Sequence, residues 1–146
     1  MRLQFIAAII GAFICAVPAV AENTVPNVLL QEKLIKTYLL TFNDANLTGN
    51  YSVLHAKLAK PFRDQFNPDK LQQAFKSFAD QKVDLGIIAA KQPIASTPST
   101  IDSRGALVVR GYFDTAPSRV VYELDFVPSE EEWKPISIHV SVKKPD

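Results

Sequence analysis

Two stretches decide the fold: LVVRGYFDTAPSRVVYELDF at Leu107–Phe126 and ISIHVSV at Ile136–Val142. Apolar and polar residues alternate through both, which is the pattern of β-strands with one buried and one polar face. A turn over Asp114–Arg119 and another over Pro128–Glu132 separate three strands, so we expect an antiparallel sheet. Its inward face is predicted to carry Leu107, Val109, Phe113, Val120, Tyr122, Leu124, Phe126, Ile136, Ile138 and Val140.

The residues before this sheet favour helices. Apolar residues recur at helical spacing from Val28 to a predicted end near Asn43-Asp44, followed by a turn over Asn46–Asn50. A second helix is predicted over Tyr51–Ala59, ended by Pro61. Asn67 is placed to cap a third helix, with Pro68 at its first position, where the missing N–H costs little. An irregular strand is predicted over Val83–Ile94, and a loop over Ala95–Ser103.

Helices at one end of a chain and strands at the other are typical of an α+β layer. We therefore expect one domain over residues 28–146, with three N-terminal helices packed on a four-stranded antiparallel sheet. No internal repeat or second domain is indicated.

The first 21 residues differ from the rest of the chain. Arg2, an apolar run over residues 5–17 and the small residues Ala19-Val20-Ala21 are the pattern of a secretory signal peptide. The alternative is a retained membrane anchor, but the apolar run is shorter than the roughly 20 residues that a span needs. We expect cleavage after Ala21, a flexible segment at residues 22–27, no membrane span thereafter, and a periplasmic or secreted protein.

Composition excludes several classes of function. Sixteen Lys and Arg residues, one of which is Arg2, face fifteen Asp and Glu residues, so the chain from Glu22 onward is neutral and no nucleic-acid partner is indicated. Cleavage would remove Cys15, the single cysteine, and with it any disulfide or thiolate site. His55 and His139 are far apart and lack metal-ligand spacing, so we expect neither a metal site nor a cofactor.

The order of elements resembles the NTF2-like (cystatin-like) superfamily, whose members place three helices on a curved sheet to form a cone. The segments that carry this resemblance are TFNDA at 41–45, GNY at 49–51, GAL at 105–107 with GYF at 111–113, and EWKPI at 132–136. The resemblance implies a pocket between the helices and the concave face of the sheet. It implies no single activity, because the superfamily includes enzymes, transport factors and exported proteins of varied role.

The inward face is apolar, with Tyr122 as its one polar group, so it favours a binding module over an enzyme. Tyr38, Tyr51 and His55 from the helices complete the candidate pocket residues. The predicted function is non-catalytic binding of an apolar small molecule or an envelope protein partner. An isomerase- or dehydratase-like enzyme remains the alternative if Asp44, Asp84 or Asp125 lies inside the cone beside a tyrosine, and a purely structural assembly domain is a third possibility.

The polar face of the sheet is a candidate interface. Arg110 can pair with Glu123 or Asp125 across strands, and Tyr112 and His139 lie on the same face. The resemblance implies dimerisation through this face, so a homodimer is predicted, and a solvated outer face is equally compatible with the sequence. Two charged clusters, Lys57-Lys60-Arg63 and Glu130–Glu132, are interpreted as solvated surface.

Overall fold

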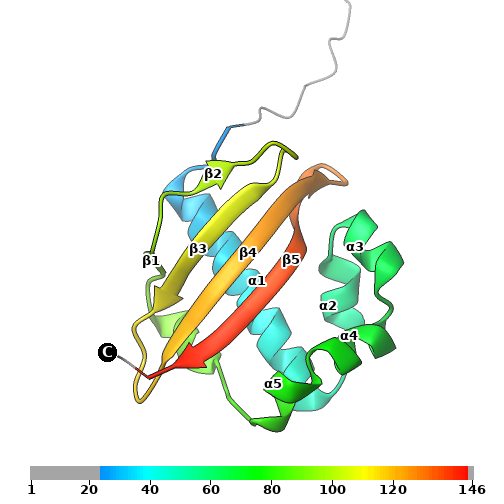
Figure 1. Ribbon diagram of the computed structural model, residues 1–146, viewed down its shortest axis with the longest axis vertical. Helices are drawn as coiled ribbons and strands as arrows, with labels where there is room; N and C mark the ends of the chain where they lie inside the picture. The colour runs from blue at the N-terminus through cyan, green and yellow to red at the C-terminus, as the bar shows by residue number, and fades with distance from the viewer. Residues whose placement is uncertain (1–23, 145–146) are drawn as a thin grey trace, which may run out of the picture.

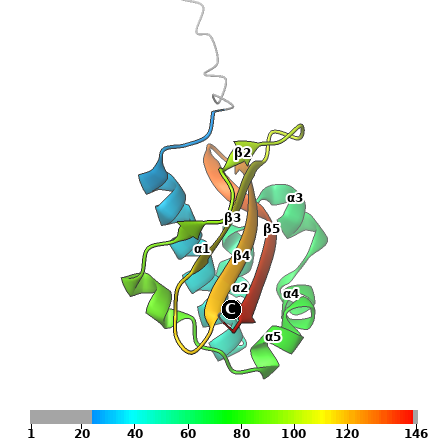
Figure 2. The same ribbon diagram turned by 60° about the vertical axis from the view of Figure 1, so that its left-hand side comes forward.

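The computed structural model describes residues 24–144, and the predicted signal peptide, residues 1–21, lies outside them (Figure 1). The described chain is α+β: an open antiparallel sheet of five strands, one long helix across one of its faces, and four short helices beside one edge (Figure 2). The α+β class is confirmed. The expected three helices and four strands are, within residues 24–144, five α-helices and five strands.

The long helix α1 spans Val28–Thr48. Asn27 caps it, because its side-chain oxygen accepts a hydrogen bond from the Leu30 N–H at 2.9 Å. The helix runs beyond the predicted end at Asn43-Asp44 because the true stop signal is Gly49, whose φ of 74° ends the last turn in the left-handed region. The predicted turn over Asn46–Asn50 is therefore mostly the last turn of the helix.

Four short helices follow, at Ser52–Lys57 (α2), Lys60–Gln65 (α3), Pro68–Ala74 (α4) and Lys76–Asp80 (α5). Pro61 does not simply end a helix, as predicted, but lies in the first turn of α3, where its missing N–H is not needed. The predicted cap of the third helix is confirmed: the Asn67 side chain accepts from the Lys70 N–H at 2.9 Å, and Pro68 begins α4.

The strand predicted over Val83–Ile94 is wrong. The segment forms a 3₁₀ helix, η1, at Gly86–Ala90, and only Ile94–Ala95 (β1) is a strand. The cause is Asn43 on α1, whose side chain accepts from the Leu85 N–H at 2.8 Å and donates to the Asp84 carboxylate at 3.0 Å. The first bond satisfies a backbone N–H that a strand would have offered to a neighbouring strand, and the second ties the same segment to α1.

The remaining strands are Thr100–Ile101 (β2), Leu107–Phe113 (β3), Arg119–Ser129 (β4) and Glu132–Lys143 (β5). Both β1 and β2 pair with β3, and the order continues through β4 to β5 at the other edge. The register of β4 against β5 shifts by one residue between Asp125 and Phe126. Asp125 pairs with Ser137, whereas Phe126 pairs with Pro135, so Ile136 has no partner on β4. Ile136 is thus the extra residue of a β-bulge, not an inward residue as predicted.

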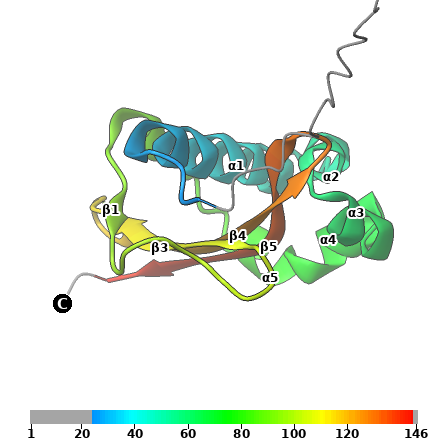
Figure 3. The same ribbon diagram turned by 90° about the horizontal axis from the view of Figure 1, so that it is seen from above.

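The core lies between α1 and the inner face of the sheet (Figure 3). The predicted inward residues of β3 and β4 are buried, as the alternation requires. Gly111 faces Tyr122 across the strands, and a Cβ at this glycine would collide with the Tyr122 hydroxyl and the Ile94 carbonyl oxygen. The centre of the layer is filled: side chains at most 1% exposed include those of Leu39, Phe42, Phe113, Tyr122 and Phe126.

Candidate ligand-binding groove

An open groove of about 460 Å³ lies at one end of the layer, where α1 and α2 meet the hairpin of β4 and β5. The helices provide one wall and the hairpin the other. We refer to it as the groove, and its lining is Leu30, Lys33, Leu34, Thr37, Tyr38, Ala56, Lys57, Glu131, Glu132, Trp133 and Lys134.

The floor of the groove is apolar and aromatic. Leu34 and Tyr38 are buried residues of α1, Leu30 is 37% exposed, and Trp133 is half-buried against the core. The Tyr38 hydroxyl lies 3.5 Å from the Trp133 carbonyl oxygen. Burial, with a smaller effect from the Glu132 carboxylate, raises the pKa of Tyr38 above its usual value.

Charged side chains form the two rims. Lys33 and Lys57 belong to the helical wall, whereas Glu131 and Glu132 belong to the hairpin wall, and all four are exposed. The Lys57 ammonium is 3.3 Å from the Thr41 hydroxyl, which itself donates to the Thr37 carbonyl oxygen at 2.8 Å. This chain of contacts places Lys57 at the groove.

The hairpin wall is held by an ion-pair cluster at its tip. Glu130 accepts hydrogen bonds from the Arg63 guanidinium on α3 and from the Lys134 ammonium at 2.9 Å. These two partners lower the pKa of Glu130 to about 2. The two loop residues, Glu130 and Glu131, have φ values of 53° and 67°, a left-handed conformation that side chains other than glycine adopt at a cost. The ion pairs of Glu130 therefore stabilise the strained turn between β4 and β5, which lies beside the groove.

Of the four predicted pocket residues, Tyr38 alone lines this groove. Tyr51 lies in a second, polar groove of about 550 Å³ between α1, α4 and α5, where its hydroxyl donates to the Asn46 side chain. The His55 ring nitrogen Nε2 is 3.1 Å from the Arg63 carbonyl oxygen. Tyr122 is 1% exposed within the core, and burial raises its pKa to about 12. The four residues therefore do not form one site.

The three aspartates considered for an enzyme lie outside the groove lining. Asp44 is exposed on α1. Asp84 accepts from the Gly86 N–H and the Asn43 amide, and these bonds lower its pKa. Asp125 is buried on the opposite face of the sheet, where it binds two arginines.

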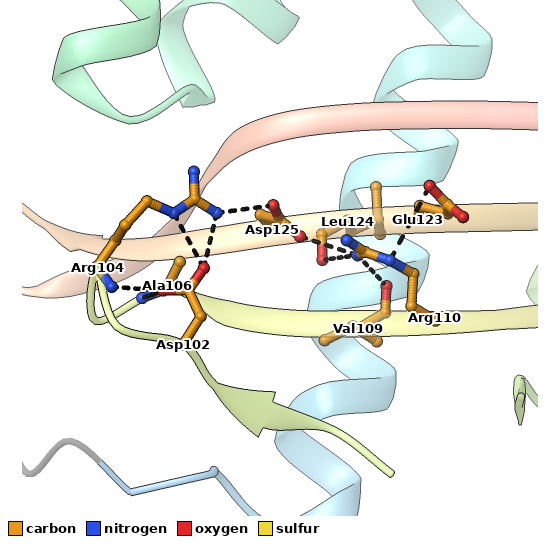
Figure 4. A network of polar contacts seen from close by, with 8 residues as sticks. All are labelled: Asp102, Arg104, Ala106, Val109, Arg110, Glu123, Leu124 and Asp125. Carbon is orange, nitrogen blue, oxygen red and sulfur yellow. Dashed lines mark hydrogen bonds and ion pairs between the residues drawn. The ribbon is translucent and has the colours of Figure 1, made fainter. Parts of the chain in front are cut away.

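Arg110, Glu123 and Asp125, three of the five predicted interface residues, lie together on the face of the sheet opposite α1 (Figure 4). The strand register places the other two, Tyr112 and His139, on the same face. The Arg110 guanidinium donates to Asp125 at 2.8 Å and lies 4.0 Å from Glu123, which faces His139 on β5. Arg104 binds both Asp102, at 2.7 Å, and Asp125, at 3.1 Å. The network ties the loop before β3 to β4.

Arg119 and Tyr112 lie beside this network. We refer to this face of the sheet, which carries Val108, Arg110, Tyr112, Val121, Glu123, Asp125 and His139, as the open face. The Arg119 guanidinium packs over the Tyr112 ring, with its carbon 4.8 Å from the ring centroid. The hydrogen bond from Arg104, followed by that from the Ala106 N–H, lowers the pKa of Asp102. These contacts fix the side chains of the open face in place.

Sequence reasoning missed the charged residues of the groove. Lys57 and the glutamates Glu131 and Glu132 had been interpreted as solvated surface, and Lys33 had not been singled out. Trp133, which had been noted only as part of a strand entry, was the available signal, because tryptophan is enriched at interfaces and here follows three glutamates.

Within residues 24–144, no cluster of His, Cys, Asp or Glu could hold a metal ion. The same part of the chain contains no helix with the length and apolar character of a membrane span. Comparison with protein-family models, with curated proteins and with solved structures finds no match to this chain.

Proposed function

We propose that this chain is a non-catalytic binding module whose groove takes a small molecule with an apolar body. One observation carries the proposal: the groove lining combines partly exposed apolar side chains, Leu30 and Trp133, with exposed lysines and glutamates on its two walls. Sites for small molecules commonly combine an apolar lining with a few polar groups that orient the ligand. The groove volume of about 460 Å³ falls in the usual range for such sites.

The acids of the groove support a binding role over proton-transfer catalysis. Glu131 and Glu132 are exposed. Catalytic sites commonly exclude water from the reacting groups, whereas these two carboxylates are open to it. The Tyr38 hydroxyl already donates to the Trp133 carbonyl oxygen, and its oxygen remains a possible acceptor for a ligand.

Export and NTF2-like membership belong to the same proposal. Export is supported by the sequence of residues 1–21, with its apolar run and its Ala19-Val20-Ala21 end. Membership is supported by the order of helices and strands and by the position of the groove between the helices and the sheet. On this proposal the module acts in the periplasm or outside the cell.

Tryptophan fluorescence tests the proposal directly, because Trp133 is the single tryptophan of the chain and lies in the groove. We expect a saturable change in the emission of the full chain during titration with 1-octanol. Leu30→Ser removes part of the floor and should weaken binding about three- to tenfold, on the energy of half-burying a leucine.

Val53→Ser is the matched control, since Val53 is an exposed aliphatic residue on α2 outside the groove lining. It should leave the affinity unchanged. A titration without saturation would contradict the proposal, and so would equal weakening by both variants.

We also propose that the open face of the sheet forms a homodimer. Val108, Tyr112 and Val121 are half-buried there beside the arginine and aspartate network. Sedimentation of the chain at micromolar concentrations should show a dimer that Tyr112→Glu dissociates. A monomer at all concentrations would refute this interface and leave the groove unaffected.

A further inference from the structure

The two walls of the groove carry opposite charges that do not neutralise each other. Lys33 and Lys57 are on the helical wall, and Glu131 and Glu132 are on the hairpin wall. Among residues 24–144, no ion pair within 4.0 Å joins either lysine to either glutamate. The groove thus keeps a positive rim and a negative rim apart, with an apolar floor between them.

In contrast to these four residues, the charged residues next to the rims already form ion pairs. Arg63 and Lys134 both bind Glu130, so the third lysine of the lining already has its counter-ion. Lys134 is also buried, at 8% exposure, and belongs to the structure of the hairpin. The charges left for a ligand are therefore two cations on one side and two anions on the other.

We propose that the groove binds an apolar ligand that carries both a free amine and a free carboxylate, namely a short apolar peptide of two or three residues. This inference rests on the proposed binding function of the groove. The amine lies toward Glu131 and Glu132, the carboxylate lies toward Lys33 and Lys57, and the apolar side chains pack on Leu30 and Trp133. A ligand with one charge would leave the opposite rim without a partner.

The apolar floor of the groove also fits a short apolar peptide. The Tyr38 hydroxyl donates to the Trp133 carbonyl oxygen at 3.5 Å, and its oxygen can still accept from a peptide N–H. Leu30 and Trp133 are partly exposed and give leucine-sized side chains an apolar surface to cover. Binding by burial with orientation from both rims explains why apolar and charged groups share one groove.

Capped peptides test the inference, with Trp133 emission as the readout on the full chain. The probes are leucine, Leu-Leu and Leu-Leu-Leu, together with Leu-Leu-Leu acetylated at its amine, amidated at its carboxylate, or capped at both ends. We expect the free tripeptide or dipeptide to bind most tightly, and each cap to weaken binding about three- to fivefold, as expected for an exposed ion pair. Tightest binding by single leucine would identify an amino acid as the ligand and refute the peptide.

Two pairs of variants assign each end of the peptide to its rim. Lys57→Gln should abolish the preference for a free carboxylate, whereas Lys60→Gln, a lysine of α3 outside the groove lining, should preserve it. Glu132→Gln should abolish the preference for a free amine, whereas Glu123→Gln, on the far face of the sheet, should preserve it.

The outcomes separate this inference from the function on which it rests. Equal affinity for free and doubly capped peptides would overturn the inference while leaving apolar binding in place. Saturation by 1-octanol but by no peptide would have the same meaning. Absence of binding by both octanol and peptides would overturn the proposed function itself.

Discussion

The centre of the α1 and sheet layer and its end at the hairpin are built from the same elements but are packed in opposite ways. At the centre, Phe42, Phe113 and Tyr122 are at most 1% exposed, and Gly111 leaves room for the Tyr122 ring. At the end, Leu30 and Trp133 remain partly exposed, and exposed lysines and glutamates flank them. The layer is closed where aromatic side chains meet and open where charged ones face each other.

This difference indicates that the closed centre provides stability, whereas the open end provides the candidate binding surface. A closed aromatic centre gains free energy from buried apolar area and has no room for a ligand. The open end gives up part of that free energy, because its apolar floor stays in contact with water until a ligand covers it. Substitutions at the centre and at the open end of the layer should therefore have different consequences.

The largest effect is expected at the centre. Phe113→Ala removes a fully buried ring and should lower the free energy of unfolding by about 3–5 kcal/mol, through lost burial and a remaining cavity. Urea denaturation followed by far-ultraviolet circular dichroism measures it. Trp133→Ala, the matching truncation in the groove, should lower stability by less, because this side chain is only partly buried. Similar losses at both positions would show that the groove floor is part of the core.

A smaller effect is expected at the strained turn. Glu131→Gly removes a side chain from a residue with φ of 67° and should raise the free energy of unfolding by about 0.5–1 kcal/mol, since glycine adopts this conformation without strain. A thermal melt should show the midpoint rising by a few degrees. Gly105 is already a left-handed glycine, so Gly105→Ala should lower the midpoint and serves as the reverse control. A lower midpoint for Glu131→Gly would mean that the turn is not strained.

The smallest effect concerns pH and the tip of the hairpin. Arg63 and Lys134 hold the pKa of Glu130 at about 2, below its ordinary 4.5, so this carboxylate stabilises the folded hairpin above pH 4.5. That contribution should be lost as the pH falls from 4.5 through about 2, and it is small because Glu130 is exposed. Trp133 emission should report the change, and Glu130→Gln should remove it. An unchanged acid transition in the variant would exclude Glu130 as its source.

Much of the fold could be predicted because the decisive signals are local. The alternation in β3 and β4 gave the correct inward residues, and Asn67 with Pro68 marked the start of α4. The segment Val83–Ile94 failed because its backbone is bound by Asn43, which lies about 40 residues away in the sequence. A side chain at that distance leaves no trace in local periodicity.

The candidate site was predicted less well, for a related reason. Tyr38, one of the predicted pocket residues, lines the groove, whereas Lys57, Glu131 and Glu132 were interpreted as solvated charges. Each is exposed and unremarkable within its own segment. Only the packing of α1 and α2 against the hairpin turns them into two opposed rims.

The sequence by itself determined the α+β class, the buried faces of the central strands and the cap of α4, because periodicity and capping act between residues that are close along the chain. The tertiary structure alone decided the 3₁₀ helix at Gly86–Ala90, the bulge at Ile136 and the groove. These features depend on hydrogen bonds, register and charges brought together from distant segments, and such pairings are fixed only when the layer closes.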